Sequence, residues 1–166
     1  MKNSSDQVNT FKAAMANYPT GVTIVTTIDN KNNPIGLTVN SFASVSLDPL
    51  LILWSIDKRV STYHIFKKVD KFAVNILSED QAAIASLFAS RNRDRFANCE
   101  WNFSKNNLPI IKGAAAALQC ETFKRVEAGD HTILIGEITD ISFENNPPLL
   151  YHARKIGALP ASFHNN

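Results

Sequence analysis

Small hydrogen-bonding side chains cluster in one short stretch of the sequence, "GLTVNSFASVS" at positions 36–46. The stretch alternates like a β-strand, in which every second side chain points to the same face. Its even positions carry hydroxyls, an amide and one aromatic ring: Thr38, Asn40, Phe42, Ser44 and Ser46. Short donors and acceptors on a stiff strand could bind a flat polar ring. The solvated face of an antiparallel sheet explains the same pattern equally well.

Two further polar features could hold an anion. Ser55 ends an apolar run, and "KRVST" at 58–62 places Lys58 and Arg59 directly before a predicted helix start at Ser61. Free N–H groups at a helix N-terminus, hydroxyls and nearby cations suit a phosphate group. These features and the polar strand could together bind an elongated ligand with a phosphate at one end. Alternatively, Ser61 is only a helix cap and the two cations lie in a solvated loop, and the sequence contains no P-loop or GxGxxG motif.

The other reactive side chains are scattered. The four histidines have no metal-binding spacing, and Cys99 and Cys120 lie outside any CxxC motif, so we expect no metal site and a reducing cytoplasm. The formal net charge of +2 over 166 residues argues against a nucleic-acid-binding protein. The first ten residues lack the apolar segment of a signal peptide, and no apolar run approaches the roughly 20 residues of a membrane span.

The elements that must position these residues are mostly strands. A continuous apolar run at 50–56 is typical of a strand buried on both faces, and Gly129-Asp130 joins two long strands as a hairpin. Short turns between consecutive strands indicate one α+β domain dominated by β-structure, an antiparallel barrel of roughly six strands. We predict strands at 22–28, 35–47, 50–56, 71–77, 114–128, 131–143 and 149–152.

Two or three helices should flank these strands. One covers 6–17 and places Val8, Phe11 and Met15 on one face. A second covers 61–68 with Ser61 as its N-cap. A third follows a capping box formed by Ser78 and Gln81, and its Ile84, Leu87 and Phe88 face the core. Residues 89–109 are predicted to form a long polar connection, and the C-terminal tail should fray.

In order and spacing, seven stretches of the sequence resemble the short flavin reductase family. They are "YPTGVTIVTT" (18–27), "GLTVNSFASVSLDPLLILWSI" (36–56), "STYHIFKKVDKFAVNIL" (61–77), "FASRNRDRF" (88–96), "LPIIKGAAAALQCE" (108–121), "GDHTILIGEI" (129–138) and "PLLYH" (148–152). The resemblance covers residues 11–158, so we expect a single domain over 1–166. It implies an FMN-binding split β-barrel with a few flanking helices.

The resemblance also implies which residues bind the flavin. The stretch 38–41 would meet the pyrimidine edge of the isoalloxazine ring, and 44–46 with 55–56 would line the ribityl chain. Residues 61–62 would take the phosphate with an arginine near, and the "DRF" motif would come close to the flavin. The implied flavin-binding residues are Thr38, Val39, Asn40, Ser41, Ser44, Val45, Ser46, Ser55, Ile56, Arg59, Ser61, Thr62, Arg95 and Phe96.

His131 has two interpretations. Its position after Gly129-Asp130 favours a turn followed by an ordinary strand residue, whereas the resemblance implies that it docks the nicotinamide of NAD(P)H. Tyr151 lies in the last matching stretch and is implied at the same substrate site. After it, "ARKIG" replaces the glycine-plus-aromatic segment that is common in the family. Cys120 matches a frequent family cysteine, and its long apolar strand indicates a core position.

The implied activity is hydride transfer from NADH or NADPH to FMN or FAD. Reduced flavin would pass to a partner flavin-dependent monooxygenase, and family resemblance also implies a homodimer. Two alternatives use the same barrel: an FMN-binding electron carrier without NAD(P)H turnover, and a binding module without redox chemistry whose serine row is solvated. The sequence distinguishes neither FMN from FAD nor NADH from NADPH.

Overall fold

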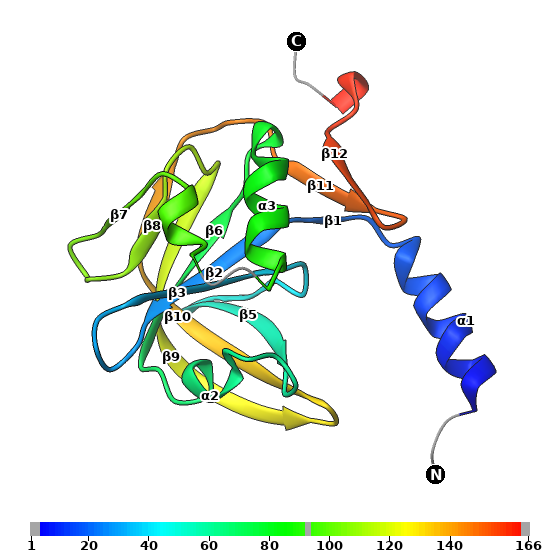
Figure 1. Ribbon diagram of the computed structural model, residues 1–166, viewed down its shortest axis with the longest axis horizontal. Helices are drawn as coiled ribbons and strands as arrows, with labels where there is room; N and C mark the ends of the chain where they lie inside the picture. The colour runs from blue at the N-terminus through cyan, green and yellow to red at the C-terminus, as the bar shows by residue number, and fades with distance from the viewer. Residues whose placement is uncertain (1–3, 92–93, 164–166) are drawn as a thin grey trace.

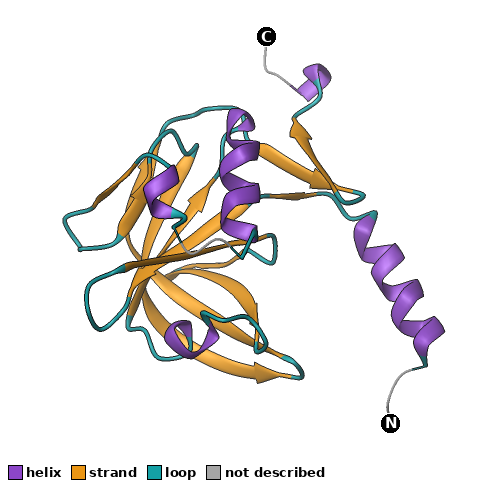
Figure 2. Cartoon of the chain, viewed as in Figure 1, coloured by secondary structure: helices purple, strands orange, loops and turns teal. Residues whose placement is uncertain are grey.

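Antiparallel strands make up most of the computed structural model, which describes residues 4–91 and 94–163 (Figures 1 and 2). The strands are β1 (Thr20–Gly21), β2 (Thr23–Ile28), β3 (Pro34–Val39), β4 (Ala43–Leu47), β5 (Leu50–Asp57), β6 (Lys71–Ile76), β7 (Trp101–Phe103), β8 (Pro109–Ile111), β9 (Ala116–Ala128), β10 (His131–Phe143), β11 (Leu149–His152) and β12 (Lys155–Ala158). The helices are α1 (Ser5–Ala16), α2 (Tyr63–Phe66) and α3 (Ala82–Ala89), with short 3-10 turns at Glu79–Gln81, Phe96–Asn98 and Ala161–Phe163.

Seven strands form one coiled sheet in the order β3-β2-β6-β9-β10-β5-β4. A second sheet has the order β1-β11-β12, and β7 pairs with β8. All of these pairings are antiparallel, which confirms the predicted β-dominated class with few helices. In Figure 1, α3 lies across one end of the large sheet, α2 lies near the other end, and α1 extends away from the body.

The core of the large sheet is aromatic. Trp54 on β5 packs edge-on against Phe66 and Phe72, with ring centroids 5.2 and 5.9 Å apart. All three side chains are fully buried. Gly136 faces Phe72, and a Cβ at position 136 would lie 2.5 Å from that ring, so the close packing requires glycine here. A second cluster joins α3 to β8 and β11 through Phe88, Ile111 and Leu149.

The prediction of one strand over 35–47 was wrong. The chain leaves β3 after Val39, turns through 40–42 and enters β4 at Ala43. These strands lie at opposite edges of the seven-stranded sheet, since β3 pairs with β2 and β4 pairs with β5. The polar residues of the "GLTVNSFASVS" stretch therefore do not share one face. Their alternation is that of two short strands joined by a turn.

The prediction that 50–56 is buried on both faces was also wrong. Ile52, Trp54 and Ile56 are buried on β5, whereas the residues between them are half-exposed. The reason is that this antiparallel sheet places its core on one side of the strand. Apolar residues on the outer side made the run look continuous in the sequence.

The helix starts were predicted with mixed success. The predicted capping box of Ser78 and Gln81 forms before α3, and a second box that was not predicted, Ser4 with Gln7, forms before α1. The Ser61 cap was wrong, because α2 has only four residues and its N-cap is Thr62, whose side chain makes no cap hydrogen bond. The chain instead turns before the helix, where the Tyr63 N–H donates to the Val60 carbonyl at 3.0 Å.

Residues 89–109 are more ordered than predicted in their described part. Phe96 packs edge-on against Trp101, which packs edge-on against Phe103, and this ladder holds the β7–β8 hairpin in place. The C-terminal tail was expected to fray, but its residues Lys155–Ala158 form β12, which pairs with β11. Neither segment has the hydrophobic periodicity that identifies an element locally. None of the helices within residues 4–91 and 94–163 is long and apolar enough to cross a membrane.

Candidate active site

A cavity of about 200 Å³ lies where β3 and β5 end and β10 begins. Seven of the residues that the sequence singled out line it, from three separate parts of the chain. Three further lining residues, Leu37, Asp57 and Val60, were missed, although each directly adjoins a predicted stretch. The full lining is Leu37, Thr38, Val39, Asn40, Ser41, Ser55, Ile56, Asp57, Val60 and His131.

Strand pairing brings these segments together. β10 runs antiparallel to β5 with His131 opposite Asp57, so the first residue of β10 faces the last residue of β5. On the other side, the Ser41 hydroxyl donates to the Ser55 carbonyl at 2.9 Å and accepts from the Ser55 N–H at 3.0 Å. Ser41 therefore attaches the turn after β3 to β5, although β3 and β5 are not neighbours in the sheet.

Two of the hydroxyls in the predicted flavin-binding stretch 38–41 are already used by the fold. Thr38 donates to the Ala85 carbonyl on α3 at 2.6 Å, and Ser41 is occupied by Ser55. The side chains of Asn40 and Ser55 make no hydrogen bond within the described part of the chain and remain available. Because β3 is an edge strand, alternate backbone N–H and C=O groups also face outward beside the cavity.

The β4 residues of the predicted set lie outside the cavity lining. Ser44 and Val45 are exposed, and the Ser46 hydroxyl accepts from the Asp48 N–H at 3.2 Å. β4 adjoins β5, the strand that carries Ser55 and Ile56, so these residues border the site without lining the cavity.

A charged cluster surrounds the end of the cavity at His131. Arg59 binds Asp57 with both ends of its guanidinium, Nε to Oδ1 at 2.9 Å and Nη2 to Oδ2 at 2.5 Å, and these bonds hold the pKa of Asp57 well below its ordinary value. His131 Nδ1 lies 2.7 Å from Asp130 Oδ1, which lowers the pKa of Asp130. Arg59 Nη2 is 4.0 Å from Asp130 Oδ2 and so approaches both carboxylates. The His131 side chain is 40% exposed and can meet a ligand.

Lys58 lies in the turn after β5, as the loop alternative proposed, and it is also bonded to the β9–β10 hairpin. Its Nζ lies 2.7 Å from Glu127 Oε2 and donates to the Gly129 carbonyl at 2.8 Å. The Thr132 hydroxyl donates to Glu127 Oε1 at 3.0 Å and lies 3.0 Å from the Tyr63 hydroxyl. These bonds join the loop before α2 to the hairpin that carries His131. Ser61 and Thr62 follow directly in the same loop.

Arg95, Phe96 and Tyr151 lie elsewhere. Arg95 donates to the Gly36 carbonyl at 2.7 Å and to the Ser90 carbonyl, and partial burial lowers its pKa. Phe96 packs edge-on against Phe88, with ring centroids 4.9 Å apart. Tyr151 pairs across strands with Thr20 on β1 and packs against the second core cluster.

The chemistry of the cavity suits a flavin ring edge. An isoalloxazine edge carries alternating N–H and C=O groups, which edge-strand backbone, an amide and a hydroxyl can match. Buried Ile56 and half-buried Val39 supply an apolar surface for the flat part of a ring. The cavity is small and its surroundings are exposed. It therefore suits the edge of a flavin ring, with the rest of the flavin lying along the protein surface. Among the described residues, no group of histidine, cysteine and carboxylate side chains could hold a metal ion.

Comparison with known proteins gives the same picture. Residues 15–160 match the flavin reductase like domain family. The chain is 44% identical over 82% of its length to the reductase component of a flavin-dependent trigonelline monooxygenase from Acinetobacter baylyi, and it spans 44% of that relative. It is 39% identical to the FMN reductase (NADH) SmoA of Agrobacterium fabrum, covering 89% of this chain and 83% of that protein.

A solved structure agrees with these relatives. The NADH:FAD oxidoreductase SgcE6 of Streptomyces globisporus, in complex with NAD and FAD fragments, superimposes with a TM-score of 0.89. It is 29% identical to this chain, and 99% of each chain is covered. The match of residues 15–160, the two relatives and this superposition together show that the chain belongs to the family of flavin reductase like domains.

Proposed function

We propose that this protein is a flavin oxidoreductase that reduces FMN or FAD with NADH or NADPH and supplies reduced flavin to a partner monooxygenase. The observation that carries the proposal is the cavity in which the ends of β3 and β5 meet His131, in a chain of the flavin reductase family. When both cofactors are bound, the nicotinamide supplies a hydride from C4 and the flavin accepts it at N5.

The roles of the protein's own residues are positioning and electrostatic. Backbone groups of 38–41 and the side chains of Asn40 and Ser55 hold the polar edge of the ring. N–H donors aimed at that edge stabilise the negative charge that develops on it during reduction. His131 docks the nicotinamide, and Asp130 orients the imidazole through the Nδ1 contact. No side chain needs to act as a nucleophile.

The phosphate end of the flavin lies in this proposal at Ser61 and Thr62, with Arg59 near. Arg59 is 78% exposed and retains free N–H groups beyond those that bind Asp57. The residues 44–46 on β4 border the ribityl chain. Arg95, Phe96 and Tyr151 do not line the described cavity, although Arg95 is bonded to the Gly36 carbonyl beside the lining residue Leu37.

Steady-state oxidation of NADH and of NADPH, each with FMN, FAD and riboflavin, tests the activity. We expect flavin-dependent turnover with at least one pair. A protein that purifies yellow, keeps its FMN and oxidises neither nucleotide would be an electron carrier. A protein that does not quench flavin fluorescence on titration would be a binding module of another kind.

The proposed assembly is a homodimer in the cytoplasm. The relative from Acinetobacter baylyi is named as the reductase component of a monooxygenase, which supports an oxygenase as the second partner.

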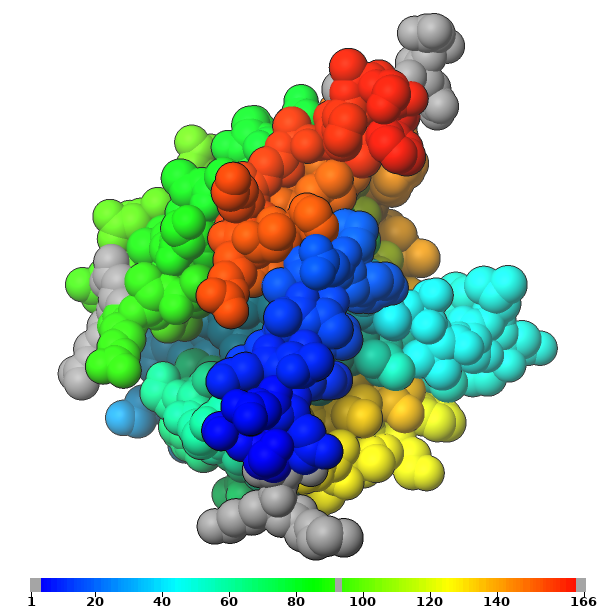
Figure 3. All heavy atoms as spheres, turned by 90° about the vertical axis from the view of Figure 1, so that its right-hand side faces the viewer, coloured from blue at the N-terminus to red at the C-terminus, as the bar shows by residue number. Residues whose placement is uncertain are grey.

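The exposed apolar face of α1 is the proposed dimer surface. Phe11, Met15 and Tyr18 are 65%, 49% and 63% exposed on and beside α1, which has no buried residue. Figure 3 looks onto the side of the molecule from which this helix extends. A second copy would cover that apolar face, and sedimentation equilibrium tests for it.

The seven-stranded sheet is proposed to be the split barrel of this family. The two hydrogen bonds between Ser41 and the Ser55 backbone support this, because they join the chain after one edge strand to the strand beside the other edge. Hydrogen exchange at the Ser55 amide tests the closure. A protected Ser55 amide is expected, and exchange as fast as in an unpaired loop would contradict it.

A further inference from the structure

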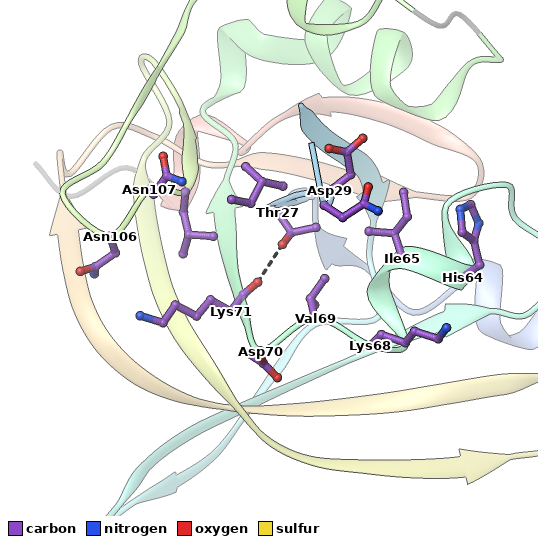
Figure 4. A pocket seen from close by; sticks show the side chains of 13 residues that line it. Thr27, Asp29, His64, Ile65, Lys68, Val69, Asp70, Lys71, Asn106 and Asn107 are labelled. Atoms are coloured by element: carbon purple, nitrogen blue, oxygen red, sulfur yellow. Dashed lines mark hydrogen bonds between the residues drawn. The ribbon is translucent and has the colours of Figure 1, made fainter. Parts of the chain in front are cut away.

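A second, larger cavity lies apart from the cavity at His131. Its volume is about 770 Å³, and the turn between β2 and β3, α2, the start of β6 and the turn between β7 and β8 surround it (Figure 4). Among the described residues, none lines both cavities. Pockets of about 300–1,000 Å³ are the usual size for small-molecule ligands. The volume is therefore sufficient for a compact organic molecule.

Part of the wall of this larger cavity is aliphatic, although most of its lining residues are polar or charged. Ile28, Ile65, Val69 and Leu108 contribute from four different segments. Leu108 is 2% exposed, and Val69 packs on the main core, so this part of the wall is fixed by the fold. An apolar, preformed surface of this kind suits a flat hydrocarbon or heterocyclic ring.

One end of the larger cavity carries cationic and donor groups without partners. His64 lies on α2, Lys68 lies two residues after the end of that helix, and both line the cavity. Within residues 4–91 and 94–163, neither side chain makes a hydrogen bond or an ion pair. Lys71 extends toward the opposite side (Figure 4), and its Nζ lies 3.6 Å from Glu121 Oε1. The available positive charge is thus concentrated at Lys68.

The carboxylates of the larger cavity do not cancel this charge. Asp29 accepts bonds from the backbone N–H groups of Lys31 and Asn33 at 2.8 and 2.9 Å and from Asn33 Nδ2 at 3.0 Å, which lower its pKa and stabilise its negative charge within the turn. Figure 4 shows the Asp29 carboxylate pointing away from Thr27 and the Asp70 carboxylate pointing away from His64. The end at His64 and Lys68 is left to attract an anion.

We propose that this larger cavity binds a small planar organic anion, an aromatic or heterocyclic carboxylate. The carboxylate pairs with Lys68 and accepts from His64, and the ring lies on Ile65, Val69 and Leu108. Charge complementarity at Lys68 and the aliphatic surface formed by Ile65, Val69 and Leu108 select this class over a neutral hydrocarbon or a bare inorganic anion. The proposal goes beyond flavin reduction and does not depend on it.

The test uses the full-length protein with 2-naphthoate as the probe and amide NMR shifts as the readout. We expect saturable shifts at the β2–β3 turn, α2 and the β7–β8 turn. Lys68→Gln should weaken binding about tenfold, because one charge-assisted hydrogen bond is lost. Lys67→Gln is the matched control, since Lys67 is an exposed neighbour that does not line the cavity. That variant should bind like the parent protein. Neutral 2-naphthalenemethanol should bind the parent protein about tenfold more weakly than 2-naphthoate does. Its affinity for both lysine variants should equal its affinity for the parent protein.

Several results would overturn the proposal. They are the absence of saturable shifts, shifts confined to other elements, equal affinity for the acid and the alcohol, and equal weakening by the two lysine variants. Displacement of the probe by saturating FMN would place it in the cavity at His131 instead. Melting curves of both variants exclude a folding defect. Flavin-dependent NADH oxidation is measured separately, so its loss and the loss of probe binding are distinguishable.

Discussion

The hydroxyl of Ser41 bridges both backbone groups of Ser55, at 3.0 Å from the N–H and 2.9 Å from the carbonyl oxygen. A side chain here replaces the backbone partner that a neighbouring strand would supply. It fixes the turn after β3 against β5, and with it the position of Asn40 at the cavity. The first prediction follows from this contact.

Ser41→Ala should lower the free energy of unfolding by about 1–3 kcal/mol, because two half-buried backbone groups lose their partner. Urea denaturation measures the loss. Ser41→Thr keeps the hydroxyl and is the matched control. An alanine variant as stable as the parent protein would show that water satisfies Ser55 equally well.

Replacing Ser61 and Thr62 together with alanine should weaken FMN binding more than riboflavin binding, because only FMN carries the phosphate. The expected difference is about tenfold or more, from the loss of charge-assisted hydrogen bonds. Fluorescence quenching titrations of both flavins measure it. Equal losses for the two flavins would place the phosphate elsewhere.

His131→Ala should leave flavin affinity nearly intact and raise KM for NAD(P)H, or slow reduction of bound flavin. A misplacement of about 1 Å at the reacting carbon costs on the order of 100-fold in rate. Rapid-mixing reduction by NADH is recorded beside a melting curve. Unchanged reduction at every NADH concentration with a lowered Tm would restrict His131 to shaping the hairpin.

Cys99 and Cys120 should not take part in turnover. Burial raises the pKa of Cys120 to about 12 and also raises that of Cys99, so both are protonated thiols at neutral pH. The double alanine variant should lose about 1 kcal/mol of stability, mainly from the core position 120, and keep its kcat. A variant that is folded yet inactive would require a thiol mechanism.

Arg59→Gln should lower stability in a pH-dependent way. The pKa of Asp57 is lower in the folded protein than its ordinary value of 3.8, mainly through the hydrogen bonds from Arg59. The unfolded chain therefore binds the proton more readily, and the contribution of Asp57 is present above pH 3.8 and lost as the pH falls below it. Urea midpoints of parent and variant between about pH 2 and pH 7 should differ at neutral pH and converge in acid. A constant difference would contradict this assignment.

The sequence alone predicted most of the architecture. The strands predicted at 22–28, 71–77 and 149–152 match β2, β6 and β11 within a residue or two, and Gly129-Asp130 located the turn of the long hairpin. The capping box at Ser78 marked the start of the α3 region. These signals succeed because period, turn residues and caps are local properties of the chain. The β7–β8 hairpin was not predicted from the sequence. Contacts among Phe96, Trp101 and Phe103 stabilise it, and these contacts exist only after folding.

The candidate site was also predicted only in part: the sequence indicated its segments, and the tertiary structure decided their hydrogen-bond partners. The residue types at 38–41, 55–56 and 131, together with the family resemblance, predicted a polar ligand site, and the structure brings these three segments to one cavity. Only the tertiary structure decided which polar groups stay available, since Thr38 and Ser41 are used by Ala85 and Ser55. It also placed Arg59 on Asp57 and Lys58 on Glu127. Hydrogen-bond partners that are distant in the sequence are set by strand register, and no local pattern in the chain encodes them.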